Sequence, residues 1–234
     1  MENKVHALFP SQDPRLVAEI VGAAHARIDR VKELVARSPA LAKASWDWGF
    51  GDWESALGAC SHTGRRDIAV VLLDAGARPD IFTFAMLGDL QAVKAMILSQ
   101  PGIQKTPGPH GISLLTHAWM GGDEAQSVYD YLKELGDADG RETNLEVSDL
   151  EKALYAGTYV FGQGKDDSIA VSKNSRGDLE LRRGERSVNL LRVGDHEFAP
   201  VGSPSVRVRF TVVSGASAAL TIHDPEPIVV ASKR

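Results

Sequence analysis

Two patterns of apolar positions divide the chain. Between residues 14 and 139, apolar residues recur at helical spacing in short segments that end at glycine or proline. From residue 155 onward, apolar and polar residues alternate, with glycine-containing turns between the segments. A period near 3.6 residues indicates amphipathic helices, and alternation indicates strands with one buried face. The pattern therefore predicts an α+β protein with a helical N-terminal domain and a C-terminal β-domain.

The predicted helices are short and come in pairs. Pro14 marks the first helix start, because proline is favoured at the first helical position. Ser55–Asp80 contains two further helices on either side of Gly64. The other expected helices are Arg15–Ala26, Ile28–Arg37, Ile81–Leu87, Leu90–Leu98, Leu114–Met120 and Ala125–Leu135. Residues 1–13 are expected to be a tail, and residues 140–152 a charged linker with one helical turn at Ser148–Leu154.

The segment Ser55–Asp80 resembles an ankyrin repeat. Ser55–Gly58 stands where that family has T-P-L-H, Gly64 separates the two helices, and Gly76–Asp80 ends like the family's G-A-D. The resemblance covers about residues 14–139. It implies a bacterial-type solenoid of three to four repeats with a concave groove that binds a protein or peptide partner.

Another segment supports the same resemblance. Gly108–Ser113 matches the family's D-x-x-G-x-T turn, with Gly108 in place of the usual aspartate. The interval from Gly64 to Gly88 is shorter than the interval from Gly88 to Gly122. We therefore expect the third repeat to lack the hairpin that projects between repeats, which would open one side of the groove.

Residues 153–234 are expected to form the β-domain, an antiparallel meander that closes into a small barrel or half-barrel. The Y-x-G-x-Y, G-x-L-x-L, F-x-P and V-x-F runs resemble the lipocalin-like domain appended to bacterial serine β-lactamase-type hydrolases and peptidases. The expected strands are Tyr155–Phe161, Ser168–Val171, Leu179–Leu181, Ser187–Arg192, Glu197–Val201, Val206–Val213 and Ala218–His223. The expected core residues are Tyr159, Phe161, Leu179, Leu190, Phe198, Phe210 and Leu220, which favour a packed interior over a ligand cavity.

A tryptophan-rich segment, Trp46–Glu54, stands at the position of a projecting hairpin. Tryptophan side chains dominate binding hot spots, so this segment is a candidate recognition surface. The alternative is that its rings cap the solenoid and shield its edge. The candidate binding residues lie on this hairpin, on the neighbouring helices and, for His110, on the turn at Gly108–Ser113; they are Trp46, Asp47, Trp48, Phe50, Asp52, Trp53, Glu54, His62, Met86, His110 and Trp119.

A second function remains open, namely a small-molecule or enzymatic site in the same groove. His62 and His110 are expected to approach each other across the shortened repeat, with Asp47 or Asp52 beside them and Trp48 and Trp53 as walls. Such groups suit acid–base catalysis near neutral pH, with Asp52 and the two histidines as the catalytic set. A two-histidine, one-carboxylate set also suits a divalent metal. Histidines of ankyrin inner helices are commonly structural, however.

Known catalytic fingerprints are absent from the sequence: it has no H-E-x-x-H, Walker A, G-x-S-x-G or dinucleotide motif. The sequence therefore favours a non-catalytic recognition protein, with no metal or cofactor, and the β-domain as a cap or second binding surface. His117 is expected either on the groove or inside the stack.

Charge and composition narrow the partners further. The formal net charge of −5 disfavours nucleic acid as the main partner. The single cysteine, Cys60, excludes an intramolecular disulfide and is expected to be a buried thiol. No run of 18 apolar residues occurs, so we expect no membrane insertion. The expected location is soluble and cytoplasmic, or periplasmic if a signal peptide has been removed. A subunit of an envelope assembly is a third possibility.

Overall fold

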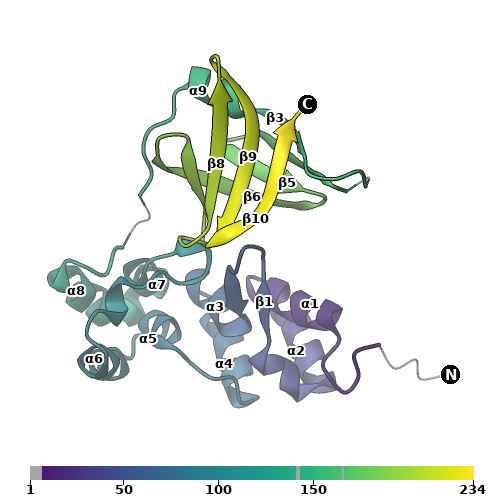
Figure 1. Ribbon diagram of the computed structural model, residues 1–234. Helices are drawn as coiled ribbons and strands as arrows, with labels where there is room; N and C mark the ends of the chain where they lie inside the picture. The colour runs from purple at the N-terminus through teal and green to yellow at the C-terminus, as the bar shows by residue number, and fades with distance from the viewer. Residues whose placement is uncertain (1–6, 141–142, 165) are drawn as a thin grey trace. The chain divides into compact units, whose positions relative to one another are not determined.

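The computed structural model describes residues 7–140, 143–164 and 166–234. The chain forms two compact units, residues 1–48 with 52–141, and residues 49–51 with 142–234. The first unit is mostly helical and the second is mostly β (Figure 1). The predicted α+β class with a C-terminal antiparallel barrel is confirmed. Part of the predicted tail, residues 1–6, and of the linker, residues 141–142, lies outside the described residues.

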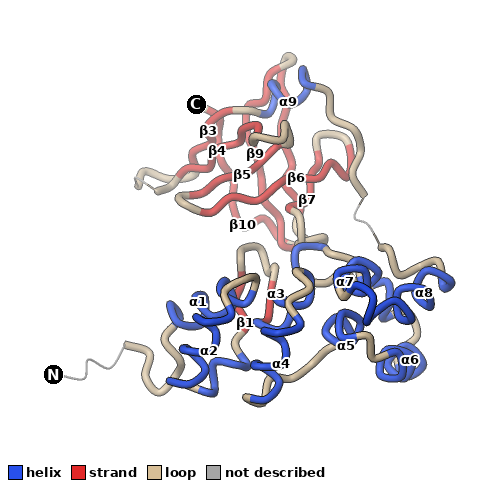
Figure 2. The backbone as a smooth tube through the Cα atoms, turned by 180° about the vertical axis from the view of Figure 1, so that it is seen from behind, coloured by secondary structure: helices blue, strands red, loops and turns tan. Residues whose placement is uncertain are grey.

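The helices of the first unit follow one another in pairs joined by short turns (Figure 2). Three of them, α2, α5 and α7, have the bounds that the sequence predicts. The α-helices are Pro14–Ala24 (α1), Ile28–Arg37 (α2), Ala56–His62 (α3), Arg66–Asp74 (α4), Ile81–Leu87 (α5), Leu90–Ser99 (α6), Leu114–Met120 (α7) and Gln126–Leu135 (α8). Short 3₁₀ segments lie at Pro39–Lys43 (η1), Ile103–Lys105 (η2), Pro109–Gly111 (η3) and Gly122–Ala125 (η4).

Side-chain caps fix where these helices begin. Asp13, Ser55, Asp80 and Ser113 each accept a hydrogen bond from a backbone N–H in the first turn of the following helix. Such caps satisfy donors that have no partner within the helix. Helices this short are marginal alone, so they depend on packing against one another.

The helices pack in a regular order. Along one layer α1 contacts α3, α3 contacts α5 and α5 contacts α7, while α2 contacts α4 and α6 contacts α8. Fully buried apolar side chains fill the space between the layers, among them Ile20, Leu72, Leu114 and Leu132. Cys60 is buried as predicted, and its Sγ donates a hydrogen bond to the Leu57 carbonyl oxygen. Burial raises the pKa of this thiol to about 12.

The tryptophan-rich segment forms the predicted hairpin. Its strands are Ser45–Asp47 (β1) and Trp53–Ser55 (β2), and they pair in antiparallel register with Trp46 opposite Glu54. Side chains of a strand alternate between its two faces. Glu54 is therefore turned to the buried side, whereas Trp53 is exposed.

The second unit is a closed barrel of antiparallel strands in the order β10-β3-β4-β5-β6-β7-β8-β9. The strands are Gly157–Val160 (β3), Ser168–Lys173 (β4), Leu179–Arg183 (β5), Arg186–Gly194 (β6), Glu197–Pro200 (β7), Arg207–Val213 (β8), Ala216–Asp224 (β9) and Glu226–Lys233 (β10). The predicted helical turn is helix α9, Asp149–Tyr155, which begins with a capping box between Ser148 and Glu151. The closing strand β10 was not predicted.

Aromatic side chains fill the barrel. The predicted core residues are buried except Phe161, which is half-buried beneath the Arg183 guanidinium. Tyr155, Phe198 and Phe210 pack ring against ring at centroid distances of 4.6–5.5 Å. The Tyr159 hydroxyl donates to the Tyr155 carbonyl oxygen at 2.6 Å. These contacts agree with the predicted packed interior.

None of the helices in the described part of the chain combines the length and the apolar character needed to cross a bilayer.

Candidate metal centre

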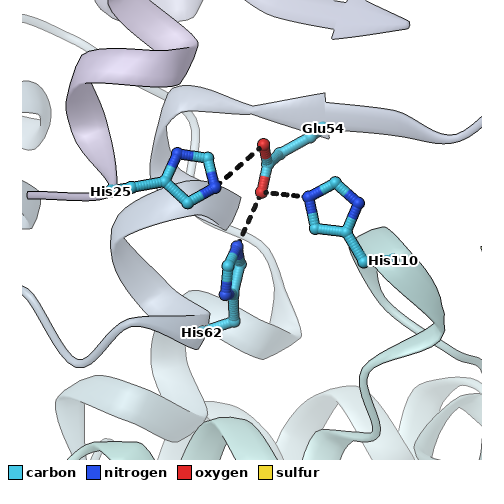
Figure 3. Close-up of side chains that lie close together, drawn as sticks. All are labelled: His25, Glu54, His62 and His110. Atoms are coloured by element: carbon cyan, nitrogen blue, oxygen red, sulfur yellow. Dashed lines mark hydrogen bonds and ion pairs between the residues drawn. The ribbon is translucent and has the colours of Figure 1, made fainter. Parts of the chain in front are cut away.

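Four side chains of the helical unit meet at one point. His25, Glu54, His62 and His110 each offer one ligand atom, and these atoms all lie within 4.8 Å of one another (Figure 3). His25 is the residue that caps the end of α1, Glu54 lies on β2, and His62 is the last residue of α3. His110 comes from the η3 loop. Four separate elements thus supply the donors.

Glu54 is the centre of the cluster. Its Oε1 lies 2.8 Å from His62 Nε2 and 3.4 Å from His110 Nε2, and its Oε2 lies 3.5 Å from His25 Nε2. Trp48 Nε1 also donates a hydrogen bond to Oε2, at 2.7 Å. The Glu54 side chain is fully buried, and no lysine or arginine among the described residues forms an ion pair with it. The negative charge of Glu54 must therefore be balanced by a protonated imidazole or by a cation bound among the imidazoles.

In two of the histidines, the ring nitrogen that faces away from Glu54, Nδ1, lies within hydrogen-bonding distance of an acceptor oxygen. His25 Nδ1 lies 3.2 Å from the Val21 carbonyl oxygen and 3.3 Å from that of Gly22. His110 Nδ1 lies 2.7 Å from Asp52 Oδ2. A carbonyl or carboxylate oxygen accepts a hydrogen bond from Nδ1–H, which leaves Nε2 of a neutral ring as the acceptor. Metal-binding histidines are oriented by this type of contact.

His110 has an unusual backbone conformation. Its φ is 57° and its ψ is 23°, in the left-handed region that few residues other than glycine adopt. The same Asp52 carboxylate stabilises it, because Oδ1 accepts the backbone N–H of His110 at 2.8 Å. Asp52 thus fixes both the main chain and the ring of His110. Backbone strain held in this way is typical of functional sites.

The cluster shifts the pKa values of its members. Burial alone would raise the pKa of Glu54, but hydrogen bonds from His110 and His62 lower it to about 2. Hydrogen bonds to Asp52 and Glu54 raise the pKa of His110 to about 10. Near neutral pH the metal-free cluster therefore contains an ionised Glu54 and a protonated His110.

His117 lies in the stack rather than in the cluster. It is fully buried, and its ring centroid is 6.1 Å from that of His62. Its Nδ1 lies 2.8 Å from Ser61 Oγ, which itself donates to the Phe82 carbonyl oxygen. Burial lowers the pKa of His117 to about 3, so the ring is neutral. We assign His117 to the helix core.

The other predicted site residues of the hairpin lie at different depths. Asp52 is buried, Trp48 is 37% exposed at the rim of the cluster, and Trp53 is 64% exposed. Trp46 is half-buried against the helix core, and Asp47 is half-buried on β1. Phe50 stands at the hairpin tip with a φ of 57°.

Two predicted residues lie on helices away from the cluster. Met86 is fully buried in the core, so it presents no surface to a ligand. Trp119 on α7 is 66% exposed. The structure thus brings together His62, His110, Asp52, Glu54 and Trp48, while Trp53, Trp119 and Met86 lie outside that group.

His25 is the one ligand that the sequence interpretation omitted. A signal for it exists, because a histidine directly follows the last residue of α1 and another is the last residue of α3. Each of these histidines stands just before the turn to the second helix of its pair. The rings of these two histidines are 5.0 Å apart.

Comparison of the sequence with models of protein families finds no match, and comparison with curated proteins also finds none.

Proposed function

We propose that the N-terminal unit is an ankyrin-type scaffold whose function centres on a bound divalent transition metal. The ligands are His25, Glu54, His62 and His110. The observation that carries this proposal is the convergence of four donor atoms from four elements within 4.8 Å. The regular contacts between successive helix pairs and the hairpin before α3 support the ankyrin-type scaffold.

The donor set fits zinc or a neighbouring first-row ion. Imidazole nitrogen and carboxylate oxygen are common zinc ligands, with bonds of about 2.0–2.2 Å. A tetrahedral ion with such bonds holds its donors roughly 3.3 Å apart. The three distances between Glu54 oxygens and histidine Nε2 atoms are 2.8, 3.4 and 3.5 Å. Small side-chain shifts therefore suffice to admit an ion.

A purely structural role of the cluster does not explain why three histidines surround one carboxylate. One protonated histidine, such as His110 with its raised pKa, is enough to balance the buried charge of Glu54. Three histidine Nε2 atoms face the same carboxylate, and His25 and His110 each have Nδ1 held by an acceptor oxygen. Orientation of several imidazoles toward one point is what a metal requires. The expectation of no metal, drawn from the sequence, is therefore replaced by this proposal.

The experiment is a zinc titration of the full chain in competition with a chromophoric chelator. We expect one ion per chain, and a loss of affinity of more than about 100-fold in His62→Ala and Glu54→Gln. His223→Ala on the barrel strand β9 is the matched control and should bind as the wild type does. Circular dichroism checks that each variant folds. Equal zinc affinity in wild type and in both ligand variants would contradict the proposal.

Protein recognition remains the second candidate function. The observation that favours it is the exposure of two indoles in this unit, Trp53 and Trp119. Exposed tryptophans are the residues most enriched in binding hot spots. The barrel would then serve as a cap or a second binding surface. A partner captured by the wild type but lost in a Trp53→Ala, Trp119→Ala double variant would support it, and a partner retained by the variant would count against these two anchors.

A further inference from the structure

The exposure of the four ligands is uneven. Glu54 is fully buried and the His62 side chain is 10% exposed, whereas the side chains of His25 and His110 are 29% and 31% exposed. Figure 3 shows His25 and His110 on opposite sides of Glu54, with His62 approaching from a third direction. Solvent therefore reaches the cluster at His25 and His110, and the Trp48 ring lies at similar centroid distances from both, 6.5 and 6.4 Å.

We propose that the metal centre is open where His25 and His110 meet solvent and binds a small carboxylate monoanion directly to the ion, beside Trp48. This inference rests on the proposed metal site and names its ligand class. Structural zinc sites are closed by four protein ligands, whereas catalytic sites keep a position for water or substrate. Here four protein donors would complete a tetrahedral shell, so the carboxylate would bind as a fifth ligand, an expansion that zinc undergoes in catalytic sites.

The charges of the site indicate a monoanion. A divalent ion with Glu54 and three neutral imidazoles has a net charge of +1 in its ligand shell. One further negative ligand neutralises that shell. Asp52 lies just outside it, hydrogen-bonded to His110. Among the described residues, no lysine or arginine forms an ion pair with Glu54 or Asp52. A dianion such as sulfate therefore lacks a partner for its second charge.

Trp48 supplies an apolar wall at the rim. Its ring centroid lies 6.5 Å from that of His25 and 6.4 Å from that of His110. The hydrogen bond from its Nε1 to Glu54 fixes the direction of the indole. The partly exposed ring can then contact a short hydrocarbon group attached to a bound carboxylate. We therefore expect propionate to bind more tightly than acetate.

Cobalt(II) in place of zinc tests the inference, since its visible absorption reports coordination. The full chain is loaded with Co²⁺ and titrated with acetate, propionate and sulfate. We expect saturable spectral changes with both carboxylates and at least a tenfold weaker response to sulfate. An unchanged spectrum of the bound Co²⁺ would show a closed site and overturn this inference while leaving the metal proposal intact. Failure of Co²⁺ and of zinc to bind would overturn both.

Two tryptophan variants test the contact between Trp48 and the bound carboxylate separately from metal binding. Trp48→Ala also loses the hydrogen bond to Glu54, so its Co²⁺ affinity should fall. At saturating Co²⁺ it should still bind acetate but lose most of the preference for propionate over acetate. Trp53→Ala, on the exposed face of the same hairpin, is the matched control and should keep that preference. If Trp48→Ala keeps the wild-type preference, Trp48 is not the wall and the proposed position of the ligand is wrong.

Discussion

Asp52 holds His110 with both of its carboxylate oxygens. Oδ1 accepts the backbone N–H at 2.8 Å, and Oδ2 lies 2.7 Å from the ring Nδ1. These residues belong to the hairpin loop and to the η3 loop, which are far apart in the sequence. The contact fixes a residue in a strained backbone conformation and points its Nε2 toward Glu54. Asp52 is thus a positioning residue for the proposed metal centre.

Removal of this positioning contact should weaken metal binding. In Asp52→Asn, the amide oxygen or nitrogen can face His110, so the ring orientation is no longer fixed. Outer-shell substitutions of this kind typically reduce metal affinity by about 10–100-fold. Chelator competition measures the change, with Asp123→Asn, an exposed aspartate in η4, as the control. Wild-type affinity in Asp52→Asn would mean that the contact has no role in binding.

Metal binding should stabilise the helical unit in particular. Zinc at 100 times its dissociation constant adds about 2.7 kcal/mol to the free energy of unfolding, if the unfolded chain does not bind it. All four tryptophans lie in this unit, so tryptophan fluorescence reports its unfolding. A chelator should reverse the gain, and His62→Ala should show none. A gain of equal size in His62→Ala would place the ion elsewhere.

Gly88 tests the packing between helix pairs. It ends α5 with a φ of 78°, and a Cβ there would lie 2.1 Å from the Glu124 carbonyl oxygen. Gly136 ends α8 with a φ of 74°, and a Cβ there would meet nothing within 4 Å. The left-handed conformation alone costs an alanine about 1–2 kcal/mol. Denaturant unfolding should therefore show that Gly88→Ala loses clearly more stability than Gly136→Ala. Equal losses would show that the close approach is relieved without cost.

Acid should weaken the attachment of α9 to the barrel. Hydrogen bonds from the Ser148 backbone and side chain, and from Arg192, lower the pKa of Glu151 to about 2. Because the pKa of Glu151 is lower in the folded state, its ionised carboxylate stabilises the fold at pH values above the unfolded-state pKa of 4.5. This stabilisation is lost as the pH falls from 4.5 toward 2. Hydrogen exchange of α9 should therefore become faster across this interval, and less steeply so in Glu151→Gln. Glu185→Gln, in an exposed turn, is the control; an unchanged pH profile in Glu151→Gln would refute the assignment.

Local signals were sufficient to predict most of the fold. Short amphipathic segments bounded by capping residues and glycine predicted the helices, since those signals act within one turn of the chain. Alternation and turn residues predicted seven of the barrel strands. Strand β10 was missed because Pro227 interrupts its pattern, and the strand pairing shifts register between Pro227 and Val229. Proline in a strand is confined to edges and bulges, so it argued against a strand here.

The candidate site was only partly predictable. Register in the helix pairs indicated that His62 and His110 approach each other, and their ring centroids are 5.5 Å apart. The position of His25 depends on how α1 packs on α3, so it can be inferred only by comparing the ends of the two helices, which each have a histidine. The burial of Glu54 depends in the same way on the side of the hairpin that faces the helices. Met86 satisfied the groove pattern but lies in the core, because the helix face it occupies contacts the neighbouring helices.

The most direct measurement is a crystal structure of the full chain grown with zinc, with data recorded at the zinc absorption edge. We expect one strong anomalous peak within about 2.0–2.2 Å of the Nε2 atoms of His25, His62 and His110 and of a Glu54 oxygen. An additional ligand should lie where His25 and His110 meet solvent. Anomalous peaks only elsewhere on the chain, with the four side chains still hydrogen-bonded to one another, would contradict the central claim.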